Sequence, residues 1–158
     1  MAAYDIFGLI LAALCGGAIG VERELSGKAA GLKTNVLICI GAAVFSIISK
    51  QFGGALDGSV TRIAAQIVTG VGFLGAGAII QDRAGVHGLT TAATIWLVAS
   101  IGMACGVGFY WLALIATALA IAVLFGLPYM SKFIVSLRHP SRVMKKQGEE
   151  TAGDRQNE

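Results

Sequence analysis

Charged side chains are scarce in this sequence. Only 13% of its 158 residues are Asp, Glu, Lys or Arg, whereas hydrophobic residues make up 56%. Ordinary soluble domains carry roughly a quarter charged residues, so the composition excludes an ordinary soluble protein and predicts a membrane protein. The length has room for one compact bundle of helices and excludes a second, enzyme-sized soluble domain.

Residues of the catalytic kind are equally few. The two histidines, His87 and His139, are isolated from each other, and we find no Ser–His–Asp arrangement, metal-ligand spacing or nucleotide-binding loop around them. We therefore expect no enzymatic activity and no cofactor. We also expect no nucleic-acid partner.

Cysteine occurs three times, always inside an apolar run, at Cys15, Cys39 and Cys105. Three is an odd number, and the sequence predicts Cys105 near the opposite membrane face from the other two. No disulfide framework is therefore implied. We interpret the three cysteines as small packing residues.

Long apolar runs dominate what remains. A helix needs approximately 20 residues to cross a bilayer; the last three runs reach or nearly reach that length, and the first two fall short unless they borrow neighbouring residues. The sequence therefore predicts an all-α, polytopic bundle of five transmembrane helices within residues 1–135, or of four if one short span fails to insert. Residues 136–158 form a polar tail that we expect to be disordered. The runs cover residues 6–20, 36–49, 63–80, 89–107 and 109–127.

The positive charges predict the orientation of these helices. With the N-terminus outside, ten of the twelve Lys and Arg residues lie on the cytoplasmic side and only Lys50 and Arg62 lie outside. Because cytoplasmic loops of membrane proteins are enriched in Lys and Arg, we expect the N-terminus outside and the C-terminal tail in the cytoplasm. The first apolar run has no basic residue before it, so we do not expect a removable signal peptide.

Glycines concentrate in two of the apolar runs. In lipid, small residues let helices approach closely, so we predict two helix-packing faces. On the third run we expect the glycine strip to lie against a neighbouring helix within the bilayer. The glycines concerned are Gly16 and Gly20 in the first run, and Gly70, Gly72, Gly75 and Gly77 in the third.

A polar cluster is predicted at the cytoplasmic ends of the first and third runs. Glu22, Arg23 and Glu24 follow the first, and Asp82 and Arg83 follow the third. One interpretation is a solvated loop that fixes orientation; the other is a carboxylate pair, held by Arg23 or Arg83, that binds a cation or a partner. Magnesium needs oxygen ligands, which makes Glu22, Glu24 and Asp82 the only candidate cluster. We find no convincing acidic residue at mid-membrane, which weighs against a dedicated cation pathway.

Further polar residues lie at the edges of the third and fourth runs. Arg62 and Gln66 are one helical turn apart, and Arg62 is either an anchor at the membrane edge or part of a site. Thr90 and Thr91, with Thr94 one turn further in, open the fourth run, where threonine can cap a helix by accepting from its free amides. The alternative is a helix N-terminus that favours an anion or a carboxylate.

Two passages of the sequence look alike. Residues 31–34 read Gly-Leu-Lys-Thr and residues 88–91 read Gly-Leu-Thr-Thr, and each opens an apolar run after a charged link. We hypothesise a parallel internal repeat that relates helices one and two to helices three and four about an axis along the membrane normal.

Taken together, these motifs closely resemble the MgtC/SapB family of bacterial inner-membrane proteins. The resemblance covers about residues 8–125 and is carried by residues 22–24, 30–34, 62–77 and 88–96. It implies a five-helix domain in the bacterial inner membrane and an association with growth under magnesium limitation, with survival inside host cells in some members. It implies no established chemical activity. Longer members carry a soluble C-terminal domain, which we do not expect where this sequence has a polar tail.

Two functions stay open. The first is a regulatory membrane protein that packs against its own copies, with a dimer favoured, or against a larger membrane complex. The second is an oligomeric transporter or channel for magnesium or another small ion. The density of small residues on the spans favours regulation, with the lipid bilayer as the constant partner of the chain.

Overall fold

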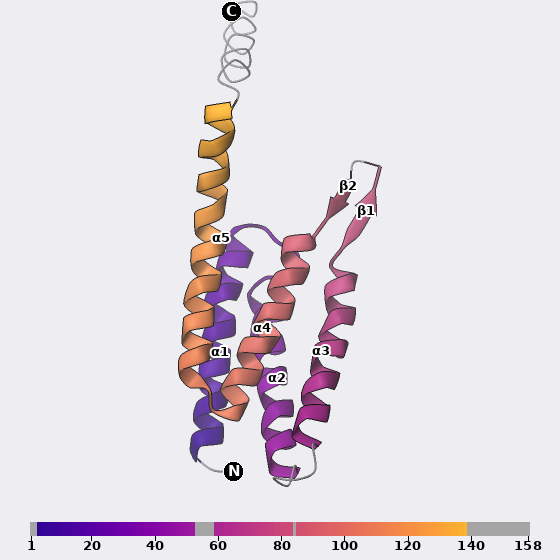
Figure 1. Cartoon of the computed structure of the whole chain (residues 1–158), viewed down its shortest axis with the longest axis vertical. Coiled ribbons are helices and arrows are strands. Elements are labelled where there is room, and N and C mark those ends of the chain that lie inside the picture. The colour runs from indigo at the N-terminus through magenta and orange to yellow at the C-terminus, as the bar shows by residue number, and fades with distance from the viewer. Residues whose placement is uncertain (1–2, 53–58, 84, 139–158) are drawn as a thin grey trace, which may run out of the picture. The chain divides into compact units, whose positions relative to one another are not determined.

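A computed structural model describes residues 3–52, 59–83 and 85–138, with side chains described for residues 3–51, 64–83 and 85–127 (Figure 1). Five helices and two short strands form within these residues, and the all-α membrane bundle expected from the sequence is confirmed. In chain order the elements are α1 (Ala3–Leu25), α2 (Leu32–Phe52), α3 (Ser59–Gly77), β1 (Ile80–Asp82), β2 (Gly85–His87), α4 (Leu89–Val107) and α5 (Tyr110–Arg138).

The first two helices take in neighbouring residues beyond the predicted apolar runs. Among the described residues, four helices are long and apolar enough to cross a membrane, and they include α1 with 23 residues and α2 with 20 residues over Leu32–Gln51. The first two spans therefore extend beyond the predicted runs, because α1 takes in Ala3 and α2 begins at Leu32. α3 spans 19 residues over Ser59–Gly77, and its side chains are described from Ala64 onward.

The chain divides into two units, Met1–Ile121 and Ala122–Glu158. The first contains α1 to α4, the two strands and the start of α5. In the second, the described residues continue α5 to Arg138. The tail expected at 136–158 lies outside the described residues beyond Arg138, and its disorder stays a prediction.

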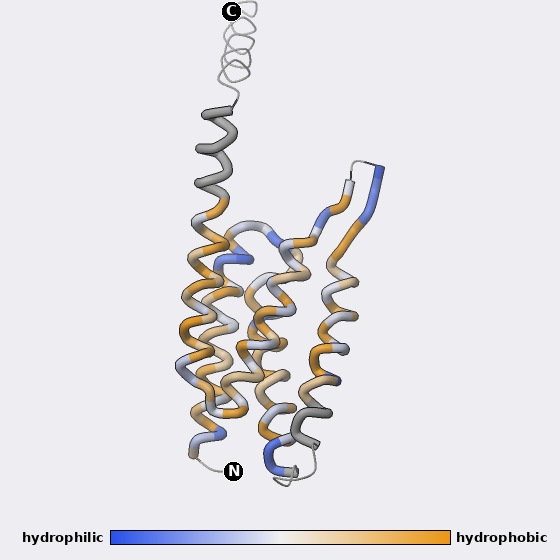
Figure 2. The backbone as a smooth tube through the Cα atoms, in the orientation of Figure 1, coloured by the Kyte–Doolittle hydropathy of each residue, from blue (hydrophilic) through white to orange (hydrophobic). Residues whose placement is uncertain are grey.

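Helices α1 to α4 run alternately up and down in the first unit (Figure 1). The α1–α2 link and the β1–β2 hairpin therefore lie at one end, which carries Arg23, Lys28, Lys33 and Arg83. Hydrophilic residues gather at the two ends and hydrophobic residues fill the middle (Figure 2). Because cytoplasmic loops are enriched in Lys and Arg, we expect the hairpin end on the cytoplasmic side, and this orientation stays a prediction.

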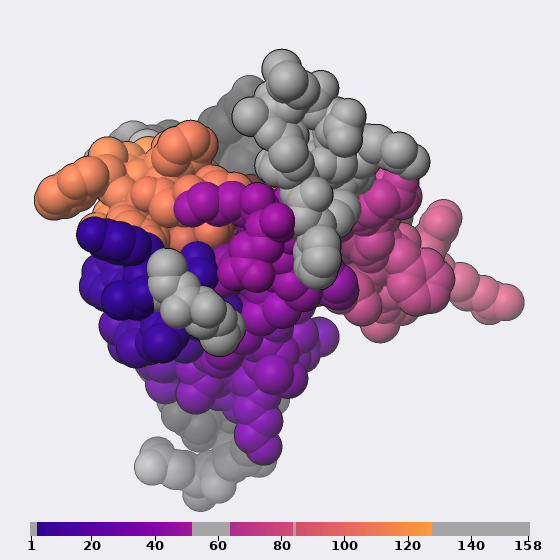
Figure 3. All heavy atoms as spheres, turned by 90° about the horizontal axis from the view of Figure 1, so that it is seen from below, coloured from indigo at the N-terminus to yellow at the C-terminus, as the bar shows by residue number. Residues whose placement is uncertain are grey.

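The core of the first unit lies between α1, α2 and α4. Their facing side chains are almost completely buried and include Ala12, Ile19, Cys39, Val98 and Ile101. Seen from the end at which α1 begins, the atoms of α1 and α2 adjoin, whereas α3 and the hairpin extend to one side (Figure 3). α3 contacts α2 and α4.

Close backbone contact holds these three helices together. A Cβ atom added to Gly16 would lie 2.7 Å from the Cβ of Cys39, and one added to Gly20 would lie 2.8 Å from the Cα of Leu32. The predicted packing face on α1 is therefore confirmed. α4 uses the same device, because a Cβ on Gly106 would lie 2.8 Å from the Cβ of Ser46.

The glycine strip on α3 packs differently from the prediction. Only Gly75 touches another helix, with its added Cβ 3.8 Å from the Cβ of Ala92 on α4. Positions Gly70, Gly72 and Gly77 have nothing within 4 Å in the described structure. The prediction that the strip lies against a neighbouring helix is wrong for these three within one chain. Helical spacing turns the stripe of Ile67, Val71, Gly75 and Ala78 inward instead, and Ile67 and Val71 join a core cluster with Ile95 and Ala99 of α4.

The hypothesis of an internal repeat agrees with the helix boundaries. α2 begins at Leu32 and α4 at Leu89, each directly after the glycine of the matching passage. The two links differ, because α1 and α2 are joined by a turn whereas α3 and α4 are joined by a β-hairpin. Superposition of the two helix pairs stays a prediction.

Candidate functional site

Glu22 and Arg23 form a buried ion pair in the last turn of α1. Their side chains are only 3% and 4% exposed. Arg23 Nε pairs with Glu22 Oε2, and Arg23 Nη2 donates to Glu22 Oε1 at 2.6 Å, while Ser26 Oγ donates to the same oxygen at 2.8 Å. Such two-pronged contacts are the stronger kind of charged hydrogen bond. Of the two arginines expected to hold a carboxylate, Arg23 does so, and it neutralises Glu22 within the fold.

Glu24 has a different role, at the start of α2. Its Oε2 accepts a hydrogen bond of 2.9 Å from the backbone N–H of Leu32, which satisfies one of the free amides at a helix N-terminus. A Cβ on Gly31 would overlap this carboxylate. The acidic motif and the Gly-Leu-Lys-Thr passage are therefore two halves of one connection.

The turn between them brings these halves together. Gly27 has φ +63°, a left-handed conformation that glycine adopts without strain. The backbone N–H of Lys28 donates to the carbonyl of Arg23, and that of Gly27 donates to the carbonyl of Glu24, each at 3.0 Å. This pattern ends a helix and satisfies its last carbonyls. This turn therefore holds the carboxylate of Glu24 beside the first residue of α2.

Asn35 is a buried polar residue that the sequence did not single out. It is completely buried, and its Nδ2 donates to the carbonyls of Ala30 and Gly31 at 2.7 Å and 2.8 Å. Its Oδ1 has no partner in the described structure. The available signal was a single amide at the edge of an apolar run. Asn35 ties the α1–α2 link to α2.

The threonines of α4 do not cap it. Gly88, with φ +88°, precedes the helix and no side chain bonds to its free amides; a Cβ on Gly88 would overlap the carbonyl oxygen of Ala78. Thr94 Oγ1 donates instead to the carbonyl of Thr90 at 2.8 Å, and Thr91 and Thr94 are buried. The capping prediction is wrong because backbone contact with the end of α3 leaves room only for glycine there.

Asp82 and Arg83 lie at the exposed tip of the β1–β2 hairpin. The strands pair antiparallel with Ile80 opposite His87, and Asp82 Oδ1 accepts from the N–H of Gly85 at 3.0 Å. Among the described residues, no group of three His, Cys, Asp or Glu side chains could hold a metal ion. The structure therefore does not bring Glu22, Glu24 and Asp82 together as one magnesium site.

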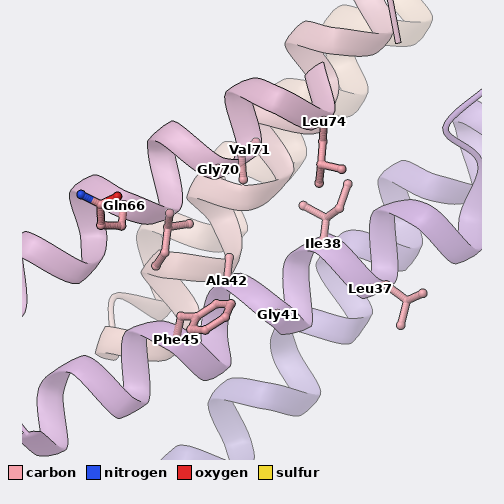
Figure 4. Close-up of a pocket in the computed structure, with 10 residues that line it drawn as sticks. Leu37, Ile38, Gly41, Ala42, Phe45, Gln66, Gly70, Val71 and Leu74 are labelled. Atoms are coloured by element: carbon pink, nitrogen blue, oxygen red, sulfur yellow. The ribbon is translucent and has the colours of Figure 1, made fainter. Parts of the chain in front are cut away.

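The predicted pair of Arg62 and Gln66 is described only in part. The Arg62 side chain lies outside the described residues, so its role as anchor or site residue stays a prediction. Gln66 is exposed and lines an apolar groove of about 580 Å³ between α2 and α3 (Figure 4). Position Gly70 lines the same groove.

Two of the three cysteines meet across the core. Cys15 on α1 and Cys105 on α4 lie close enough to interact, although the sequence placed them near opposite faces. Side chains tilt toward the N-terminus of their own helix, so residues at different levels of two antiparallel helices can meet. All three cysteines are buried free thiols.

A family model described as MgtC family matches residues 9–133. The chain is 50% identical over 133 residues to "Putative magnesium transporter YhiD" of Escherichia coli strain K12, which covers 78% of this chain and 60% of that protein. It is 50% identical over 110 residues to "Protein MgtC" of Brucella abortus strain 2308, and the match covers 70% of this chain and 45% of that protein. No solved structure matches.

"Protein MgtC" of Salmonella typhimurium strain LT2 is a further relative, 49% identical over 112 residues, which cover 71% of this chain and 47% of that protein. The chain therefore spans about half to three-fifths of the length of these curated relatives.

Proposed function

This chain belongs to the MgtC family, and from that membership we propose a regulatory role linked to growth under magnesium limitation. The chain is a multi-pass protein of the bacterial inner membrane. It acts, in this proposal, through helix contacts with its own copies or with a larger membrane complex. The link to magnesium rests on the family and on the name of the Escherichia coli relative.

This proposal rests on the bonds that the carboxylates of the family motif make within the fold. Glu22 is neutralised by Arg23 and bonded by Ser26, and Glu24 caps α2 through Leu32. These residues of the family motif thus hold the link between α1 and α2 in place. Side chains such as Ile19 and Ile101 fill the space between α1, α2 and α4. Both carboxylates are already bonded, and side chains fill the space between the helices. These two features support regulation over ion conduction.

Magnesium transport is the second candidate. The relative that shares 50% identity with this chain carries the name of a putative magnesium transporter. The exposed carboxylate of Asp82 at the hairpin tip is of the kind that hydrated magnesium contacts. Transport would then use an oligomer rather than the core of a single chain.

A flux assay separates the two functions. We expect liposomes that contain the purified full chain and an internal magnesium-sensitive dye to take up magnesium no faster than empty liposomes. An added ionophore serves as the positive control for the dye. Uptake above the empty liposomes that is lost in Glu24→Gln or Asp82→Asn would contradict the regulatory proposal and establish transport.

The proposal also includes a dimer that uses the exposed side of α3. Because Gly72 meets open space within one chain, we expect Gly72→Leu to accumulate normally but to lower the dimer fraction, since bulk at a close helix contact forces the helices apart. Crosslinking in membranes measures that fraction. The matched control is Gly126→Leu on α5, another glycine with nothing within 4 Å. An unchanged dimer fraction in Gly72→Leu would show that this side of α3 is not the contact.

A further inference from the structure

The groove between α2 and α3 has the form of an apolar trough. Its volume is about 580 Å³. An added Cβ on Gly41 of α2 or on Gly70 of α3 would meet nothing within 4 Å, so both walls are bare where these glycines lie. Leu37 and Phe45 of α2 and Leu74 of α3 are exposed along it (Figure 4). The full lining is Leu37, Ile38, Gly41, Ala42, Phe45, Gln66, Ile67, Gly70, Val71 and Leu74.

The size and polarity of the groove suit a hydrocarbon chain. Nine of its ten lining residues are apolar or glycine, and Gln66 is the exception. If a methylene group takes up about as much room as a water molecule, roughly 30 Å³, the groove holds roughly twenty such groups. That is about the size of one acyl chain of a phospholipid.

A basic residue, Lys33, precedes the α2 lining of this groove. Lys33 lies one helical turn before Leu37, the first residue of α2 that lines the groove, and therefore on the same side of the helix as Leu37. Lys33 is exposed and makes no ion pair with any residue that the structure describes. The nearby carboxylate of Glu24 is bonded to Leu32. Basic groups between helices on the cytoplasmic side recognise anionic lipid headgroups.

We propose that the α2–α3 groove binds an acyl chain of an anionic phospholipid, whose headgroup phosphate pairs with the ammonium of Lys33. The trough supplies contact area for the chain, and Lys33 supplies the preference for negative charge. This site is independent of whether the protein regulates or transports.

Spin-labelled lipids test the charge preference. The full chain is reconstituted in vesicles of phosphatidylcholine and phosphatidylglycerol, and electron paramagnetic resonance measures how much of each labelled lipid is immobilised. We expect phosphatidylglycerol to be preferred, and Lys33→Gln to lower that preference roughly fivefold, the factor for one lysine near an anionic surface. Lys28→Gln, an exposed lysine at the same end, is the control and should keep it. Equal losses in both variants would overturn the assignment to Lys33.

Leucine substitutions that fill the groove test where the lipid binds. We expect Gly70→Leu, and Gly41→Leu from the opposite wall, to release the immobilised lipid, whereas Gly72→Leu keeps it because 3.6 residues per turn place Gly72 on the far side of α3 from Gly70. Immobilised lipid that persists in both groove variants contradicts the proposal. A lower dimer fraction in Gly70→Leu, with no lipid preference in the unmodified chain, would show that a second copy fills the groove and would also overturn it.

Discussion

Gly102→Leu is expected to prevent the folded chain from accumulating in the membrane. Gly102 of α4 faces the backbone of α2, where an added Cβ would overlap the carbonyl oxygen of Cys39 and lie 2.9 Å from its carbonyl carbon. The same Cβ would lie 3.0 Å from the Cβ of Ala42. Backbone atoms within a helix cannot rotate aside, so α2 and α4 must separate.

The expected cost follows from what that separation removes. Extra methylenes in a packed core destabilise by typically about 1–3 kcal/mol, and leucine adds four carbons at a site without room for one. Close packing is also a main source of helix association in lipid. We therefore expect a loss of at least about 3 kcal/mol in the free energy of unfolding, measured by unfolding in mixed micelles.

Gly41→Leu is the matched control for Gly102→Leu. Gly41 lies on α2 and is also a glycine of a packed span, but its added Cβ meets nothing within 4 Å. Surface substitutions of this kind usually change stability by less than about 0.5 kcal/mol. If Gly102→Leu is as stable as Gly41→Leu, the described contact between α2 and α4 is not the native one.

The sequence predicted the bundle and one of its packing faces. Long apolar runs indicate membrane helices because hydrocarbon demands them, and a spacing of four between Gly16 and Gly20 places both on one side of a helix. Gly102 and Gly106 of α4 have the same spacing, so the sequence also contained the signal for the packing face on α4. On α3 the glycines at 70, 72, 75 and 77 point in several directions, and spacing alone does not say which side turns inward.

The cytoplasmic links were less predictable, for a physical reason. Strands of three residues, such as Ile80–Asp82, are too short to show a period. The bond from Leu32 to Glu24 joins residues eight apart and depends on the turn at Gly27. Charge pattern alone identified the residues of this cluster, but only the folded link shows which carboxylate is neutralised and which one caps a helix.

Arg23→Met is expected to be a severely damaging change in the polar cluster. It leaves Glu22, which is 3% exposed, buried without its cation, and removing one partner of a buried ion pair costs about 3–5 kcal/mol. Glu22→Gln leaves Arg23 unpaired and should cost a similar amount. Glu24→Gln, at an exposed helix cap, should cost only about 1 kcal/mol. Unfolding in mixed micelles measures all three.

The double variant decides whether the pair is structural. With both charges removed, Glu22→Gln combined with Arg23→Met should be clearly more stable than the sum of the single losses predicts, because no charge is left buried alone. Additive losses would mean that Glu22 and Arg23 act separately. Arg23→Met with unchanged stability would mean that Glu22 finds another cation, and the carboxylate would again be a candidate ligand. A strong coupling between the two residues instead makes this part of the family motif a brace that fixes the α1–α2 link, as the regulatory proposal requires.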